Sequence, residues 1–400
     1  MSEAVRRRMK IALFTNTYPP SVNGVANCTH MYRRGLAELG HEVHVFAPEP
    51  VGDDPFEQDS FVNRYPALKV PGEVDYTIAL PLPFAMRIFS MLSHLHVDIV
   101  HTQHPLWVGR WGQTYASRKD FPLVSTAHTQ YQVFADRVLL PEEWIAPLIT
   151  RQVVTYYNRC QVVTTPVKWM RDRLQEDGVT CAIELVPNPV DLSGLSNPDR
   201  EGTRRRLGIA PDDVVIGYLG RLSEEKNLPV VIEAVRLLSS EREAVRLLIV
   251  GDGPVTGDLR RECQRVGIAE RSIFTGAVPH SQVGHYHASL DMFLTASRSE
   301  TQPLAYTEAM YTGTPVVALA TPGATDMIRH EVNGLLVDPD RGAEGLAEAS
   351  RRLLADPALT GRVLEGGRRF AERCSHISVA HRLLEVYAQA AELFSARGRS

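Results

Sequence analysis

Cysteine is scarce in this chain of 400 residues, and long apolar runs are missing. The five cysteines are odd in number, scattered, and without a C-x-x-C pair. That pattern argues against a disulfide framework or a zinc site, and it is typical of reduced thiols in a cytosolic protein. No stretch approaches the roughly 18 apolar residues that span a bilayer. No apolar segment follows the arginines at residues 6–8, so we expect no signal peptide and a cytoplasmic location.

An excess of positive charge is also missing. Lysine and arginine together number 43 and the acidic residues 47, which gives a formal net charge of -4. A dedicated nucleic-acid-binding protein normally carries a strong basic excess, so we expect no nucleic-acid partner. The absence of a G-x-x-x-x-G-K-[ST] run argues against a P-loop NTPase. Gly251 and Gly253 begin like a dinucleotide-binding fingerprint, but Thr256 occupies the position of the third glycine.

What the sequence does contain is a repeated alternation of strand and helix patterns. Amphipathic segments, such as residues 25–39 and a last helix at about 378–394, alternate with short apolar runs. A polar, turn-rich stretch at residues 191–200 interrupts the alternation. We therefore predict an α/β protein with two doubly wound parallel sheets, a hinge near residues 192–205, and strand ends that face a common cleft. The runs that indicate buried parallel strands are residues 10–15, 42–47, 98–101, 122–127, 214–219, 245–250, 272–275, 291–295 and 315–319.

Two glutamates flank the start of one predicted helix. Glu300 follows the strand at residues 291–295, Pro303 suits the first helical position, and Glu308 lies inside the helix. At about 1.5 Å of rise per residue, the helical stretch from Pro303 to Glu308 spans less than roughly 10 Å. This arrangement suits a sugar–diphosphate–nucleoside, with one acid for the sugar, one for the ribose and the helix end for the diphosphate. The spacing alone also fits two solvated glutamates beside an ordinary helix.

A glycine-led loop with two cations follows the strand at residues 214–219. Gly220 permits a sharp turn, and Arg221 and Lys226 then project ahead of a helix. A departing diphosphate needs cations, because negative charge builds on its oxygen in the transition state. The alternative is a solvated charged loop, which the position directly behind a strand disfavours. Loop cations are normally solvated, so we expect their removal to cost activity rather than stability.

Together these segments resemble the G-R-x-x-x-x-K and E-x7-E signatures of the retaining glycosyltransferase family GT4, which has the GT-B architecture. The resemblance covers nearly the whole chain and implies two Rossmann-like, doubly wound domains that face a central cleft. It implies an acceptor-side domain at residues 1–195 and a nucleotide-sugar-binding domain at residues 206–377. The helix within residues 378–400 is expected to pack back on the first domain.

The resemblance also implies roles for individual residues. His128, in the segment that follows the strand at residues 122–127, is expected to touch the donor sugar, although a histidine at a strand end is by itself more often structural. The expected catalytic residues are His128, Arg221, Lys226 and Glu300. The expected donor-binding residues are Gly24, Gly220, Arg221, Lys226, Val278, Glu300, Gln302, Pro303, Leu304, Ala305 and Glu308. The acceptor-side candidates are Tyr18, Asn23, Trp107 and Tyr131.

No metal or other cofactor is implied, because a front-face displacement with protein cations on the diphosphate needs none. Residues 338–340 spell the D-x-D motif that binds metal in a different glycosyltransferase fold, but they follow residues 333–337, which resemble a surface turn of the family. Two positions depart from many relatives, which have Asn-Gly where this chain has Asn188-Pro189, and glycine where it has Pro303. Since proline offers no N–H, we expect the phosphate contacts to shift to the amides of Leu304 and Ala305.

Two further segments bear on the acceptor. Residues 98–106 are similar to the D-x-V-H-x-x-x-P-x segment of bacterial diacylglycerol α-glucosyltransferases, and residues 125–131 resemble their T-x-H-T-x-Y segment. The implied reaction is transfer of a hexose, glucose from UDP-glucose, to a lipid hydroxyl such as that of diacylglycerol at the inner face of the cell membrane. A GDP-mannose-dependent α-mannosyltransferase acting on a lipid or glycan is an alternative. A sugar-nucleotide epimerase or hydrolase with the same fold is another.

Overall fold

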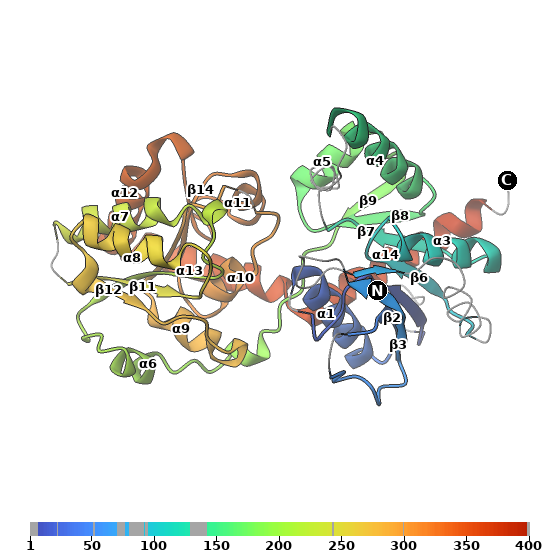
Figure 1. The fold of residues 1–400 in the computed structure, drawn as a ribbon, viewed down its shortest axis with the longest axis horizontal. Coiled ribbons are helices and arrows are strands. Elements are labelled where there is room, and N and C mark those ends of the chain that lie inside the picture. The colour runs from blue at the N-terminus through green and yellow to red at the C-terminus, as the bar shows by residue number, and fades with distance from the viewer. Residues whose placement is uncertain are drawn as a thin grey trace. The chain divides into compact units, whose positions relative to one another are not determined.

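The computed structural model divides the chain into two compact units, Met1–Pro189 with His376–Ser400, called unit 1, and Val190–Ser375, called unit 2. Each unit is built around one parallel sheet with helices packed on it (Figure 1). Among the described helices, none combines the length and hydrophobicity needed to cross a membrane. The structure describes residues 7–21, 23–50, 53–69, 77–79, 92, 95–128, 142–241, 244–298 and 300–397.

The sheet of unit 1 has seven parallel strands in the order β3-β2-β1-β6-β7-β8-β9. Its central strands are buried on both faces, which explains why they appear in the sequence as continuous apolar runs. The chain leaves β1 toward β2 on one side and later returns to β6 on the other, so a topological switch point lies between β1 and β6. The strands are β1 Lys10–Phe14, β2 Glu42–Pro48, β3 Val62–Tyr65, β6 Ile99–Thr102, β7 Leu123–Thr126, β8 Val162–Thr165 and β9 Ala182–Leu185.

The sheet of unit 2 has six parallel strands in the order β12-β11-β10-β13-β14-β15. Here the switch point lies between β10 and β13. Ligands of open α/β sheets bind outside the carboxyl ends of the strands at such points, so the loops after β10 and β13 are where a ligand is expected. The strands are β10 Val214–Leu219, β11 Val245–Val250, β12 Ser272–Phe274, β13 Met292–Thr295, β14 Val316–Leu319 and β15 Leu335–Val337.

The helices cover both sheets and supply most of the buried side chains outside the strands. In unit 1 they are α1 Gly24–Glu38, α3 Val108–Lys119, α4 Glu142–Tyr157, α5 Lys168–Glu176 and α14 His376–Arg397. In unit 2 they are α6 Arg200–Arg206, α7 Leu228–Ser239, α8 Thr256–Arg265, α9 Val283–Ser289, α10 Leu304–Tyr311, α11 Pro322–Met327, α12 Gly342–Ala355 and α13 Pro357–Arg373. The short elements are the strand pair β4 Ala67–Lys69 and β5 Thr77–Ala79, and the 3₁₀ turns η3 Ser193–Leu195, η4 Glu224–Lys226, η5 Ala269–Arg271, η6 His280–Gln282 and η7 Pro339–Arg341.

The C-terminal helix α14 is an integral part of unit 1, although it follows the whole of unit 2 in the sequence (Figure 1). It packs on α1, where Gly35 approaches so closely that an added Cβ would lie 2.3 Å from the carbonyl oxygen of His376. Its Tyr387 hydroxyl lies 2.8 Å from Nδ1 of His101 on β6, and both side chains are buried. Close helix packing and a buried hydrogen bond therefore hold α14 to the sheet.

The structure differs from the sequence-based expectation at two boundaries. Residues 333–337 are not a surface turn, because Leu335–Val337 forms β15 and pairs with β14, and Leu335 is fully buried. Residues 200–205, which were expected to belong to the hinge, lie in helix α6. Its arginines Arg200 and Arg204 each lie 2.6 Å from a carboxylate oxygen of Asp291, which ties the helix to unit 2.

Candidate active site

The loops after β10 and β13 meet at the switch point of unit 2. The Nζ atom of Lys226 lies 2.6 Å from Oε1 of Glu300, and the two side chains are only 17% and 16% exposed. The backbones are tied as well, because the carbonyl of Glu225 accepts hydrogen bonds from the Arg298 amide at 3.0 Å and the Ser297 hydroxyl at 3.3 Å. The structure thus brings together a cation and a carboxylate that the sequence separates by 74 positions.

Close backbone packing shapes the loop that carries the cations. Gly220 has φ +149°, and its carbonyl oxygen would lie 1.9 Å from a Cβ on Gly251, so no larger residue fits at position 251. Leu222 is fully buried and anchors the loop to the core. Arg221, between the glycine and this anchor, is exposed and forms no ion pair with any residue that the structure describes. The two cations therefore differ, since Lys226 is paired and largely buried whereas Arg221 faces solvent.

Helix α10 begins directly beside this pair. Pro303 is its N-cap residue, with φ −69° and ψ 119°. The sequence predicted Pro303 as the first helical residue, so the helix begins one residue later than expected. No side chain caps the helix, and its first turn carries no acidic residue. The positive end of the helix dipole, at the amides of Leu304 and Ala305, is therefore not compensated by a carboxylate in that turn. Gln302 ahead of them is buried. This helix end is suited to an anion.

Glu308 lies inside α10 and is 8% exposed. A histidine on a neighbouring helix faces its carboxylate. His287 on α9 is fully buried, and its Nε2 lies 3.4 Å from Oε2 of Glu308. The imidazole also packs against Phe293, with ring centroids 5.6 Å apart. No motif marks His287 in the sequence, because its relation to Glu308 arises only from the packing of α9 on α10.

The remaining donor candidate of unit 2 is Val278. It follows β12, is half-buried, and packs against the hydrophobic core of the unit. Near Glu300, burial raises the pKa of Tyr218, and the Glu300 carboxylate raises it further. Burial likewise raises the pKa of Tyr306. These phenols therefore stay neutral, and the charged donor candidates at this edge of the sheet are Arg221, Lys226 and Glu300.

In unit 1 the loop after β1 is organised by side chains that the sequence analysis assigned to the acceptor side. Asn23 caps α1, since its Oδ1 accepts from the Ala26 amide at 2.9 Å, and its Nδ2 donates to the Thr17 hydroxyl at 2.7 Å. The Tyr18 side chain is buried, and its hydroxyl lies 3.1 Å from Nδ1 of His30. Both residues therefore hold the loop in place. Gly24 is different, because a Cβ there would meet no atom within 4 Å, so protein packing does not require the glycine.

His128 follows β7, close to the switch point of unit 1. Its Nε2 lies 2.7 Å from Oε1 of Gln103, the residue after β6. Burial lowers the pKa of His128 from 6.5 to about 3, so the imidazole is neutral at physiological pH. Burial, together with the nearby His128, lowers the pKa of His104 to about 3 as well. His128 is therefore a neutral hydrogen-bonding group rather than a cation.

Trp107 starts α3 in an unusual backbone conformation, with φ 52° and ψ −105°. The chain turns sharply ahead of it, and a Cβ on Gly109 would lie 1.6 Å from the carbonyl oxygen of His104. The indole is 51% exposed. A non-glycine residue held at positive φ is strained, and such strain is commonest at functional sites. Tyr131, the other aromatic acceptor candidate, lies outside the described residues.

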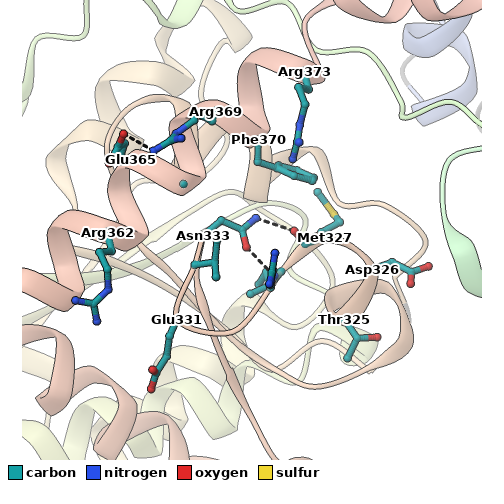
Figure 2. Close-up of a pocket in the computed structure, with 14 residues that line it drawn as sticks. Thr325, Asp326, Met327, Glu331, Asn333, Arg362, Glu365, Arg369, Phe370 and Arg373 are labelled. Atoms are coloured by element: carbon teal, nitrogen blue, oxygen red, sulfur yellow. Dashed lines mark hydrogen bonds and ion pairs between the residues drawn. The ribbon is translucent and has the colours of Figure 1, made fainter.

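A cavity of about 810 Å³ lies elsewhere in unit 2, and Figure 2 shows the residues that line it. It is lined by α11, the loop that leads to β15, and α13, and none of the expected donor residues lines it. Inside it, Glu365 pairs with Arg369, and the Asn333 side chain bonds the Arg329 amide at 2.6 Å and the Met327 carbonyl at 2.8 Å. Since none of the expected donor residues lines it, the cavity is separate from the site at the switch point.

Known proteins that resemble this chain show the family to which it belongs. The family models "Glycosyltransferase Family 4" and "Glycosyl transferases group 1" match residues 22–193 and 199–370. An alpha-monoglucosyldiacylglycerol synthase of Streptococcus pneumoniae is 30% identical over 82% of this chain and 75% of its own length. The chain belongs to glycosyltransferase family GT4. It is therefore a retaining hexosyltransferase that uses a nucleotide-sugar, and the predicted family is confirmed.

Other relatives of the GT4 enzyme differ in their named reactions. The alpha-monoglucosyldiacylglycerol synthase of Acholeplasma laidlawii is 27% identical over 96% of both chains. A GDP-mannose-dependent alpha-mannosyltransferase of Corynebacterium glutamicum is 30% identical over 88% of this chain and 82% of its own length. The solved structure of Anabaena HepE in complex with UDP superposes with a TM-score of 0.75 at 19% identity, covering 95% of this chain and all of that one. This likeness confirms the predicted GT-B fold.

Proposed function

We propose that this GT4 enzyme transfers glucose from UDP-glucose to a hydroxyl of a lipid acceptor such as diacylglycerol, with retention at the anomeric carbon. The observation that carries the proposal is the match to two alpha-monoglucosyldiacylglycerol synthases, one of which aligns over 96% of both chains. The segments at residues 98–106 and 125–131, which resemble this subgroup, support it further. In this proposal the enzyme works at the cytoplasmic membrane surface, where the acceptor resides.

The diphosphate of the donor is proposed to lie between Arg221, Lys226 and the start of α10. Arg221 is exposed and unpaired among the described residues, so its guanidinium is available to an anion. The first amides of α10 add donors, and they compensate for the N–H that Pro303 lacks. Lys226 touches Glu300, so a diphosphate on the lysine brings the attached hexose next to the carboxylate. Glu300 then accepts hydrogen bonds from sugar hydroxyls.

The reaction requires breaking the bond between C1 of the hexose and the phosphate oxygen. Negative charge builds on that oxygen, and Arg221 and Lys226 stabilise it. The acceptor hydroxyl attacks C1 from the same face, and its proton passes to the departing phosphate oxygen. His128, neutral because of its burial, hydrogen-bonds a hydroxyl of the hexose. No carboxylate nucleophile enters this scheme, and the protein cations take the role that a metal ion has in D-x-D enzymes.

Glu308 is proposed to bind the ribose hydroxyls of the donor. It is held inside α10, about one turn beyond Leu304, and is buried. Its position is fixed by the helix on one side and by His287 on the other. An acceptor of hydrogen bonds held in this way suits a part of the donor that does not change during transfer.

Trp107 is proposed to contact the apolar part of the acceptor. Its indole is half exposed at the end of the loop that follows β6, where the backbone of Gly109 packs closely on His104. A rigid, amphipathic aromatic ring suits the boundary between lipid and water. Gly24, whose missing side chain is not required by packing, leaves the start of α1 open to the donor sugar or the acceptor hydroxyl.

A GDP-mannose-dependent α-mannosyltransferase is the second candidate, because the Corynebacterium glutamicum relative is also 30% identical. Thermal unfolding with UDP-glucose, GDP-mannose and their free nucleotides distinguishes the two. A ligand at 100 times its dissociation constant stabilises the folded state by about 2.7 kcal/mol. We expect stabilisation by UDP-glucose and UDP, and little by GDP-mannose. The reverse result would contradict the proposed donor.

A further inference from the structure

Gln103 joins two strands at the switch point of unit 1. It follows β6, is fully buried, and its backbone amide donates to the carbonyl of Phe14 on β1 at 2.8 Å. Its side chain crosses to the end of β7, where Oε1 lies 2.7 Å from Nε2 of His128. No local motif marks a role for Gln103 in the sequence. In the structure Gln103 is hydrogen-bonded to His128, the residue that is proposed to contact the donor sugar.

The hydrogen bond fixes where the imidazole carries its proton. An amide oxygen can only accept, so Nε2 of His128 must be the donor. In a neutral imidazole the other nitrogen then has a free lone pair. Burial keeps His128 neutral, with its pKa lowered to about 3. Nδ1 is therefore an acceptor, which a hydroxyl group can satisfy by donating its proton.

The histidine His101, also in unit 1, differs from His128 in the partners of its ring nitrogens. His101 is also buried, but both of its ring nitrogens have partners, at 2.8 Å from the Tyr387 hydroxyl and at 2.7 Å from the Thr126 hydroxyl. Among the described residues, the only ring nitrogen of His128 with a hydrogen-bond partner is Nε2, which pairs with Gln103. The amide Nε2 of Gln103 is buried and has no hydrogen-bond partner among the described residues. Since a buried donor without a hydrogen-bond partner is unfavourable, a ligand oxygen is the expected partner.

We propose that Gln103 is a positioning residue that holds His128 in the Nε2–H tautomer and thereby presents Nδ1 to a hydroxyl of the transferred hexose. The proposal rests on the proposed function, in which His128 contacts that sugar. It adds a residue and a defined tautomer to the site. In this proposal the amide N–H of Gln103, which has no partner among the described residues, donates a second hydrogen bond to an oxygen of the same ligand.

The first test reads the tautomer directly. Long-range ¹H–¹⁵N correlation spectra of the full chain labelled with ¹⁵N-histidine distinguish the two neutral tautomers, and a His128→Gln variant identifies the resonance. At neutral pH we expect His128 as Nε2–H in the unaltered protein without donor. A His128 resonance of the Nδ1–H type would overturn the proposal without any variant of Gln103. This measurement needs neither donor nor acceptor, so it stands apart from a failure of the proposed function.

The second test uses two variants and a matched control. Gln103→Met keeps the length of the side chain but removes both polar atoms, whereas Gln103→Glu keeps an acceptor for Nε2–H. Gln161→Met is the control, because Gln161 is also buried in unit 1 and its Oε1 accepts from the Leu123 amide at 2.7 Å, at the amino end of β7. Gln161→Met removes a buried hydrogen bond of the same kind without touching His128.

We expect Gln103→Met to mix the tautomers of His128 and to lower kcat with UDP-glucose by roughly three- to ten-fold, the effect of one neutral hydrogen bond. Gln103→Glu should keep the Nε2–H tautomer and recover part of kcat. The affinity for UDP, which has no hexose, should stay unchanged in both. Gln161→Met should alter neither tautomer nor kcat, whatever its stability. Unchanged turnover and tautomer in Gln103→Met would overturn the proposal. A correct tautomer in an enzyme that glucosylates no lipid would count against the proposed function alone.

Discussion

Nζ of Lys226 lies 2.6 Å from Oε1 of Glu300, and both side chains are more than four-fifths buried. The two residues come from loops after different strands of unit 2, and they have different proposed partners, the diphosphate and the hexose. Their contact couples these roles, because removing either side chain leaves the other without its counter-charge in a largely desolvated place. The expectation that both loop cations are solvated is therefore wrong for Lys226, although it holds for Arg221.

Replacing the two cations should have similar effects on turnover and different effects on stability. Arg221→Ala and Lys226→Ala should each lower kcat by roughly two to three orders of magnitude, as for one lost transition-state donor. Arg221→Ala should leave the free energy of unfolding within about 0.5 kcal/mol, whereas Lys226→Ala should lower it by about 1–3 kcal/mol. Urea unfolding followed by far-ultraviolet circular dichroism measures the difference, with Lys226→Arg as the charge-conserving control. Equal stability of the two alanine variants would contradict the coupling.

The two glutamates of the E-x7-E segment should separate kinetically. Glu300→Gln should lower kcat more than donor affinity, because the hexose distorts during transfer and its contacts strengthen in the transition state. Glu308→Gln should mainly raise KM for the donor and weaken UDP binding, because the ribose does not change during reaction. Steady-state kinetics and calorimetric titration of UDP test this. If Glu300 governed UDP affinity while Glu308 governed only turnover, the two roles would have to be exchanged or abandoned.

Activity should survive the removal of divalent metal ions. In the proposed scheme Arg221 and Lys226 stabilise the leaving diphosphate, and Asp338 has a structural role, because its Oδ1 accepts from the Asp340 amide at 3.0 Å at the start of η7. Asp338→Asn should be nearly silent, since asparagine caps a helix about as well as aspartate. Initial rates with and without EDTA are the measurement. Strict dependence on magnesium or manganese, lost in Asp338→Asn, would overturn the metal-free scheme.

Two glycine variants in α1 should have different effects, one on stability and the other on activity. Gly35→Ala places a Cβ 2.3 Å from the His376 carbonyl oxygen and should destabilise unit 1 by about 1–3 kcal/mol. Gly24→Ala meets no atom within 4 Å, so it should keep stability but lower kcat/KM if a substrate approaches the start of α1. All four tryptophans of the chain lie in unit 1, so their fluorescence follows the unfolding of that unit. Parent-like kinetics in Gly24→Ala would remove Gly24 from the site.

Most of the central strands were predictable because parallel strands buried on both faces form uninterrupted apolar runs. The strands β3, β8 and β9 were not among the predicted runs. The runs at residues 214–219 and 245–250 coincide with β10 and β11. The edge strand β15 was not predictable, because its three residues follow an Asn-Gly turn signal that dominates the local pattern. The start of α10 was expected at Pro303, one residue too early, since proline also suits the residue just ahead of a helix.

The residues of the site were predictable only where a local motif carries them. Arg221, Lys226, Glu300 and Glu308 lie in two short segments whose spacing is visible in the sequence. The ion pair between Lys226 and Glu300 was not, because 74 positions separate the residues and only the sheet order joins their loops. Gln103 and His287 contact site residues on neighbouring elements, so no local sequence motif marks them.

The most direct measurement of the central claim is product analysis with a defined acceptor. The enzyme is incubated with UDP-glucose and diacylglycerol in detergent micelles, with GDP-mannose as the competing donor, and the lipid product is examined by mass spectrometry and by NMR of its anomeric proton. We predict an α-linked monoglucosyldiacylglycerol, formed from UDP-glucose alone and not formed by Lys226→Ala at a comparable rate. A mannosylated product, or transfer to no lipid while UDP-glucose is consumed, would contradict the proposed function.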